Sequence, residues 1–296
     1  MENPSLPRAV TALSNAKVNL FLKITGKRSD GFHELETVYH SISLQDRVTV
    51  RRTAGGLSVA SNDPALPQDA TNLAVRAAAG LLGTARRGGV GIEIDKRIPV
   101  AAGLGGGSAD AAGTLVAVNE LYGLGRSAED LGRTARSIGA DVRFMLAGGC
   151  AIGRGRGDDL EQLPALPPLA VVIAVPSISI STAWAYASLK MGLTTRQTRL
   201  TMLAGAIEKG DVAGLCDLLE NDFEALVFER FPEVKRIKDD LLDLGARGAL
   251  MSGSGSSVFG IFSKAGDAEA SGEALSKQGL TVLIASLAAR GVTISL

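Results

Sequence analysis

The residues best suited to chemistry lie in a glycine-rich segment, residues 99–109. Glycine has no Cβ, so such a backbone can wrap closely around an anion and point its N–H groups inward. A helix expected over 108–122 would add the positive end of its dipole. We therefore predict a phosphate-binding loop in which Ser108 offers its hydroxyl to a phosphate or to Mg²⁺. The predicted loop consists of Pro99, Val100, Ala101, Ala102, Gly103, Leu104, Gly105, Gly106, Gly107, Ser108 and Ala109.

The spacing within this segment separates it from two common phosphate loops. No Lys-Ser/Thr pair follows at the distance that a P-loop requires. Gly103, Gly105 and Ser108 lack the third glycine of the dinucleotide-binding fingerprint. A flexible linker, or a tight turn before a closely packed helix, remains an alternative, although consecutive glycines cost entropy that a plain turn does not require.

Two further groups have side chains that can act on a bound phosphate. Lys17 and Asn19 share the polar face of a strand expected over 16–24, and Asp141 begins a short helix or turn. Taken alone, such a lysine is usually solvated, and such an aspartate is most often a helix N-cap. Glycines concentrate at 103–107, 148–157 and 253–255. The third cluster, 253–255, precedes an expected core strand, and a plain tight loop is the alternative to a functional role.

Hydrophobic periodicity supplies the elements that must position these groups. Alternating or continuous apolar runs predict strands, and apolar residues at helical spacing predict helices. Ser127 and Asp130 form a capping-box pattern at the start of one such helix. Besides 16–24, the expected strands are 38–44, 48–51, 90–95, 169–175, 257–262 and 280–285, and the expected helices are 71–82, 108–122, 127–138, several more up to residue 244, and 266–278.

A proline-rich joint at 164–168 divides the pattern into two parts. We predict one domain over 1–165 and a second over 166–296. In the second part, strands with helices on one side indicate an α+β layer, roughly ferredoxin-like.

Composition narrows the function classes. Lys plus Arg equals Asp plus Glu, at 31 each, so there is no basic excess of the kind typical of nucleic-acid or membrane-surface proteins. The two cysteines and two histidines show no zinc-site spacing. Such cysteine usage is typical of a reducing, cytoplasmic compartment. We expect neither a nucleic-acid partner nor a membrane partner, and either a monomer or a weak homodimer.

Taken together and in order, these motifs resemble the GHMP kinase superfamily, from about residue 14 to residue 262. Four passages are closer still to those members that phosphorylate a cytidyl-methylerythritol: 16–22, 30–35, 103–110 and 139–142. The passage Asp-Gly-Phe-His within 30–35 discriminates best, because the other kinases of the superfamily have no cytidine to hold.

The resemblance implies an α+β fold in which an N-terminal α/β, ATP-binding domain joins a ferredoxin-like C-terminal domain, with the site in the cleft between them. It implies a kinase that moves the γ-phosphoryl of ATP, with Mg²⁺, onto the 2-hydroxyl of the cytidyl alcohol, in the non-mevalonate route to isoprenoid precursors. Asp141 would accept the hydroxyl proton, and Lys17 would stabilise the developing negative charge.

The resemblance also implies a substrate-binding set. His33 would bind the cytosine edge beside Phe32, and Asn19 would contact the substrate. Tyr186 would stack on the cytosine, although the nearby Trp184 is an alternative.

Two positions depart from the pattern of the family, because Asn15 and Arg143 each replace a common proline. Loss of the second proline frees an N–H and relaxes a fixed φ near Asp141. We expect the Arg143 side chain to point to solvent. Two other functions remain open: a kinase of homoserine, mevalonate or a sugar, and a nucleotide-binding regulator without catalysis.

Overall fold

Two long antiparallel strands form the centre of the structure, a computed structural model that describes residues 6–83, 88–189 and 197–295. The strands are β1 (Ala9–Lys27), β2 (His33–Thr53), β3 (Leu57–Ser61), β4 (Gly89–Asp95), β5 (Cys150–Arg154), β6 (Asp159–Leu163), β7 (Ala170–Val175), β8 (Glu220–Asn221), β9 (Gly248–Met251), β10 (Val258–Phe262), β11 (Thr281–Ala288) and β12 (Val292–Ser295). The helices are α1 (Leu73–Leu82), α2 (Gly106–Tyr122), α3 (Ala128–Ile138), α4 (Ala140–Ala147), α5 (Thr182–Ser188), α6 (Gln197–Glu208), α7 (Val212–Asp217), α8 (Phe223–Arg230), α9 (Pro232–Asp243) and α10 (Ala265–Lys277).

Strand β2 is continuous where the sequence predicts two strands, 38–44 and 48–51, so that prediction is wrong. The polar residues between them stay in the ladder, with Gln45 opposite Asn15 and Asp46 opposite Ser14. The register of β1 against β2 shifts between Asn15 and Ala16, and the two strands remain paired on both sides of the shift. Such irregularities disturb alternation without ending a strand.

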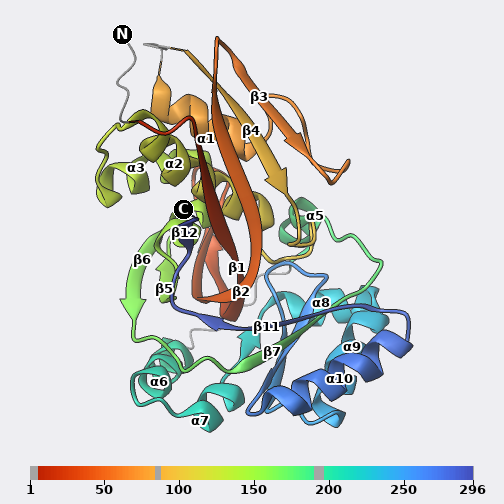
Figure 1. Ribbon diagram of the computed structural model, residues 1–296. Coiled ribbons are helices and arrows are strands. Elements are labelled where there is room, and N and C mark those ends of the chain that lie inside the picture. Colours follow the sequence, from red (N-terminus) through yellow and green to blue (C-terminus); the bar gives the residue numbers. More distant parts are fainter. Residues whose placement is uncertain (1–5, 84–87, 190–196, 296) are drawn as a thin grey trace.

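Helix α2 is the central helix of the N-terminal half and packs on α1 and on both long strands (Figure 1). Alanines and leucines around its whole circumference are buried, because neighbours surround it. It begins at Gly106, two residues earlier than expected. Its N-cap residue, Gly105, has φ +73°, a left-handed conformation that glycine adopts without strain.

The C-terminal half contains an antiparallel sheet in the order β11, β7, β10 and β9, with α9 and α10 packed against it (Figure 1). Strand β11 pairs with both β7 and β2 and so joins this sheet to the N-terminal one. Strand β12, which the periodicity did not reveal, pairs with β1. The α+β class is confirmed. The boundary at 165/166 falls between β6 and β7, and the division into domains there stays a prediction.

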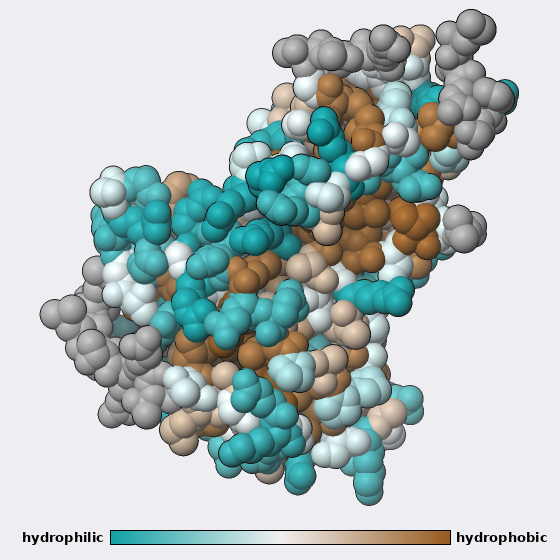
Figure 2. All heavy atoms as spheres, turned by 90° about the vertical axis from the view of Figure 1, so that its left-hand side faces the viewer, coloured by the Kyte–Doolittle hydropathy of each residue, from teal (hydrophilic) through white to brown (hydrophobic). Residues whose placement is uncertain are grey.

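The surface in Figure 2 carries many polar side chains, with apolar ones grouped in patches among them. Within the described ranges, no helix combines the length and the apolarity that a bilayer crossing demands.

Candidate active site

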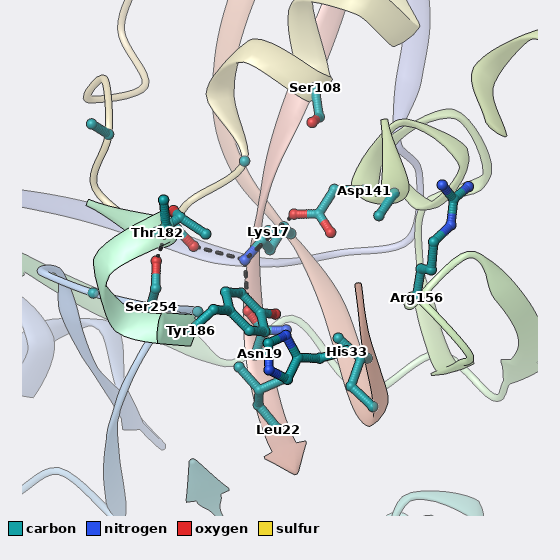
Figure 3. Close-up of a pocket in the computed structure, with 18 of the residues that line it drawn as sticks. Lys17, Asn19, Leu22, His33, Ser108, Asp141, Arg156, Thr182, Tyr186 and Ser254 are labelled. Carbon is teal, nitrogen blue, oxygen red and sulfur yellow. Dashed lines mark hydrogen bonds and ion pairs between the residues drawn. The ribbon is translucent and has the colours of Figure 1, made fainter. Parts of the chain in front are cut away.

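A cavity of about 970 Å³ brings together the residues singled out from the sequence (Figure 3). Its walls come from β1, β2, the loop before α2, α4, α5 and the segment 253–255. The predicted residues that line it are Lys17, Asn19, Phe32, His33, Pro99, Ala101, Ala102, Gly103, Gly105, Gly106, Gly107, Ser108, Asp141 and Tyr186. Three predicted loop residues do not line it: Leu104 and Ala109 are buried in the core, and Val100 is exposed.

Lys17 is buried at the centre of this cavity, with only 3% of its surface exposed. Its Nζ donates to Oδ1 of Asn19 at 2.6 Å and to the carbonyl of Gly103 at 2.7 Å. Oδ2 of Asp141 lies 4.0 Å from the same Nζ. Burial lowers the pKa of Lys17, and the charge of Asp141 opposes that effect. The solvated state that is usual for a lysine on a polar strand face is therefore absent here.

Asp141 lies in the first turn of α4 and is not the N-cap of that helix, since Gly139 holds that position. Its carboxylate accepts a hydrogen bond of 3.0 Å from the hydroxyl of Tyr39, whose ring stacks on Phe144 with centroids 4.7 Å apart. Burial first, and then the charge of Asp141, raise the pKa of Tyr39 well above its usual value. The phenol therefore keeps its proton and remains a donor to the carboxylate.

The glycine loop packs against the third glycine cluster. Gly103 has φ +77°, and a Cβ added to it would overlap the carbonyl oxygen of Ser252. The Gly103 carbonyl accepts from the Ser252 hydroxyl at 2.8 Å, and the backbone N–H of Ser257 donates to the carbonyl of Ala102 at 3.3 Å. The third cluster is therefore part of the site and not a plain loop before a strand.

A buried ionic network fixes the start of α2. Lys96 donates to a carboxylate oxygen of Asp46 on β2 and, at 2.9 Å, to Asp110 on α2. Burial raises the pKa of Asp110 to about 8, with Lys96 opposing the rise and Asp46 adding to it. A Cβ added to Gly106 would lie 3.0 Å from the Lys96 Nζ, so the network directly underlies the loop.

The cavity is also lined by aromatic rings. The rings of His33 and Tyr186 lie 4.9 Å apart, and Tyr186 is held edge-on against Phe223 at 4.9 Å. Trp184 instead packs against Phe231 and does not line the cavity. Of the two aromatic residues considered for stacking, the structure therefore places only Tyr186 at the cavity.

The side chains that replace the two family prolines both have partners. Asn15 donates to the carbonyl of Arg290 at 2.7 Å and accepts from Gln45 at 2.7 Å. Arg143 donates to the carbonyl of Asp158 at 2.7 Å. The expectation that Arg143 points to solvent is therefore wrong, because the turn between β5 and β6 folds back beside α4.

Some residues of the site carry no signal in the sequence. Tyr39 faces Asn19 across the β1–β2 ladder, and Thr182 shares a hydrogen bond of 3.0 Å at the cavity with Ser254 of the predicted 253–255 cluster. Arg156 also lines the cavity. Each stands in an ordinary local pattern, and only the strand register and the packing bring it to the site.

Comparisons with known proteins agree with this geometry. Residues 72–151 match the family model for the GHMP kinases N terminal domain, and residues 203–280 match that for the GHMP kinases C terminal. A protein of Pelotomaculum thermopropionicum named 4-diphosphocytidyl-2-C-methyl-D-erythritol kinase is 46% identical over 254 residues, 85% of this chain and 88% of that protein. The chain belongs to the GHMP kinase family. A Syntrophotalea carbinolica protein of the same name is 42% identical over 90% of this chain and 94% of its own length.

Solved structures of GHMP kinases share the fold. The crystal structure of a 4-(cytidine 5'-diphospho)-2C-methyl-D-erythritol kinase has a TM-score of 0.78 and 36% identity, covering 94% of this chain and 98% of its own. A homoserine kinase from Cytophaga hutchinsonii superimposes with a TM-score of 0.82 and covers both chains fully, but at 23% identity it shows the fold alone. GHMP kinases are ATP-dependent, and this member is accordingly a small-molecule kinase that uses ATP.

Proposed function

We propose that this kinase phosphorylates the 2-hydroxyl of 4-diphosphocytidyl-2-C-methyl-D-erythritol, in the non-mevalonate route to isoprenoid precursors. The observation that carries the proposal is that one cavity holds both the Lys17–Asp141 pair and the His33–Tyr186 pair. A substrate with a base at one end and an alcohol at the other fits that arrangement. The names of the relatives agree with it.

In this mechanism Asp141 accepts the proton of the substrate hydroxyl as its oxygen bonds to the γ-phosphorus of ATP. The bond from that phosphorus to the oxygen bridging to the β-phosphate breaks, and ADP leaves. The Nζ of Lys17, 4.0 Å from Asp141, stabilises the negative charge that develops on the transferred group. Tyr39 holds the carboxylate from its other oxygen. Positioning and electrostatics therefore supply most of the catalysis.

The ATP phosphates would lie against the glycine loop at the start of α2, where unpaired backbone N–H groups and the helix dipole favour anions. Mg²⁺, when bound, neutralises phosphate charge. The Ser108 hydroxyl lines the cavity and would be a hard oxygen ligand of the kind that Mg²⁺ prefers. Within the described residues no cluster of three His, Cys, Asp or Glu side chains could hold a metal, so the nucleotide would supply most ligands.

At the other end, His33 would bind the cytosine edge, and Tyr186 would stack on the ring, with Phe32 beside them at the mouth. Asn19 would contact the substrate near the reacting hydroxyl, since its Oδ1 already accepts from Lys17 and its Nδ2 donates to Thr37. We also assign the reaction to the cytoplasm, where the two buried free cysteines would stay reduced.

The test is ADP release from Mg·ATP with the cytidyl substrate, compared with homoserine, mevalonate and galactose. We expect turnover with the cytidyl substrate alone. Turnover with another alcohol and none with this one would leave a kinase of different specificity, and ATP binding without any turnover would point to a regulator.

Asp141→Asn tests the base. We expect kcat to fall about 10²- to 10⁴-fold, which is the usual contribution of general base catalysis. Asp159→Asn is the matched control, because Asp159 is an exposed carboxylate on β6 that does not line the cavity. If Asp141→Asn kept more than about a tenth of the activity, the assignment of the base would be wrong.

A further inference from the structure

Arg156 has no role in the mechanism above, yet it lines the same cavity as Lys17 and Asp141. It lies in the turn between β5 and β6. Figure 3 shows it on the side of the cavity where Asp141 lies, across from Thr182 and Ser254. A positively charged side chain in the wall of this cavity is suited to binding a negatively charged group of a ligand.

The guanidinium group of Arg156 is held from two sides. Its Nη2 donates to the carboxylate of Asp158 at 3.0 Å and to the carbonyl of Arg136 at 3.3 Å. Its central carbon lies 5.3 Å from the centroid of the Phe32 ring. The group is therefore oriented before any ligand binds, which lowers the entropy cost of using it.

Arg156 keeps donors available for a ligand. Asp158 also accepts from Nε of Arg136 at 2.8 Å, so two guanidinium groups share one carboxylate. The contacts found among the described residues engage only Nη2 of Arg156, which leaves its Nε and Nη1 donors for a ligand. Its side chain is 30% exposed.

The layout of the cavity indicates which group these donors meet. In the view of Figure 3, His33 and Tyr186 lie on one side of Lys17 and Ser108 on the other, and Asp141 lies on the side of Lys17 that faces Arg156. In a cytidyl alcohol the diphosphate connects the base to the alcohol, so it must lie between the aromatic pair and the Lys17–Asp141 pair. The Nζ of Lys17 already donates to the oxygens of Asn19 and Gly103, and in the proposed mechanism its charge acts on the transferred phosphoryl group. The planar fork of an arginine, in contrast, matches phosphate oxygens.

We infer that Arg156 binds the diphosphate of the nucleotide-like substrate and so selects a nucleoside diphosphate ester over an uncharged alcohol. This inference rests on the proposed function. Asp158, with Arg136 behind it, acts as the positioning residue that holds the guanidinium beside Phe32.

The experiment measures calorimetric binding of cytidine and of cytidine 5'-diphosphate (CDP) to the wild type and to Arg156→Gln. We expect CDP to bind about 10- to 100-fold more weakly to the variant, the loss typical of a charge-assisted hydrogen bond, and cytidine to bind with unchanged affinity. The matched control is Arg154→Gln, because Arg154 pairs with Glu161 at 2.6 Å and does not line the cavity.

Two outcomes overturn the inference alone. Equal losses for cytidine and CDP would mean that Arg156 only supports the Phe32 ring, and an unchanged CDP affinity would mean that it does not meet the diphosphate. Wild-type protein that binds neither ligand would overturn the proposed function as well. If Arg156→Gln does not fold, Arg156→Lys keeps the charge but loses the planar fork, and we expect it to weaken CDP binding selectively to a smaller extent.

Discussion

Replacing Tyr39 by Phe removes one hydroxyl and tests how the base is held. In the structure this hydroxyl donates to Oδ1 of Asp141 at 3.0 Å. Lys17 lies 4.0 Å from the other carboxylate oxygen, too far for a hydrogen bond of normal length. Tyr39 is therefore the closer of the two groups that set the orientation of the carboxylate.

The magnitude follows from the type of bond. A hydrogen bond to a charged group contributes about 1.5–3 kcal/mol, which corresponds to about a 10- to 150-fold change in rate if the whole contribution is lost in the transition state. The side chain of Asp141 is 32% exposed, so water can replace part of this bond. We therefore expect kcat of Tyr39→Phe to fall by about tenfold. The phenylalanine ring keeps its stack on Phe144, so we expect stability to change by less than about 1 kcal/mol.

The assay is steady-state ADP release at saturating ATP and cytidyl substrate, with an unfolding curve for each variant. The pattern that supports the reasoning is a lower kcat with an unchanged KM for ATP and an unchanged unfolding midpoint. A kcat within twofold of wild type would refute it, because the carboxylate would then be oriented without Tyr39.

Two further predictions concern the loop and the fold. Gly103→Ala should weaken ATP binding about 10- to 100-fold, because a Cβ at φ +77° would overlap the Ser252 carbonyl, and Gly132→Ala, whose Cβ has its nearest neighbour at 3.9 Å, should leave ATP binding unchanged in the same titration. Burial lowers the pKa of His40 from 6.5 to about 4, so the unfolded chain binds more protons between these values and stability falls as the pH drops through them. This difference in pKa corresponds to a loss of about 3 kcal/mol in the free energy of unfolding between pH 7 and pH 4. Urea unfolding should show that loss in the wild type and a smaller one in His40→Asn, and equal losses would contradict it.

Elements whose signals lie within a few residues were predicted from the sequence, whereas elements that depend on distant segments or on weak patterns were missed. The capping box of Ser127 and Asp130 is confirmed, because both partners lie within one helical turn. The hairpin of β5 and β6 was missed, since both strands are only five residues long and neither alternates clearly between apolar and polar residues. Strand β12 was missed because it is stabilised mainly by pairing with β1 at the other end of the chain.

Backbone chemistry and local order alone predict part of the site: a glycine loop before a helix, a lysine on a strand and an aspartate at a helix start. The folded structure adds that Lys17 and Asp141 lie 4.0 Å apart, that Tyr39 reaches Asp141 and that Arg156 lines the cavity. The first group can be predicted because the absence of a Cβ and helical periodicity act over a few residues, whereas these contacts depend on strand register and on packing between distant segments.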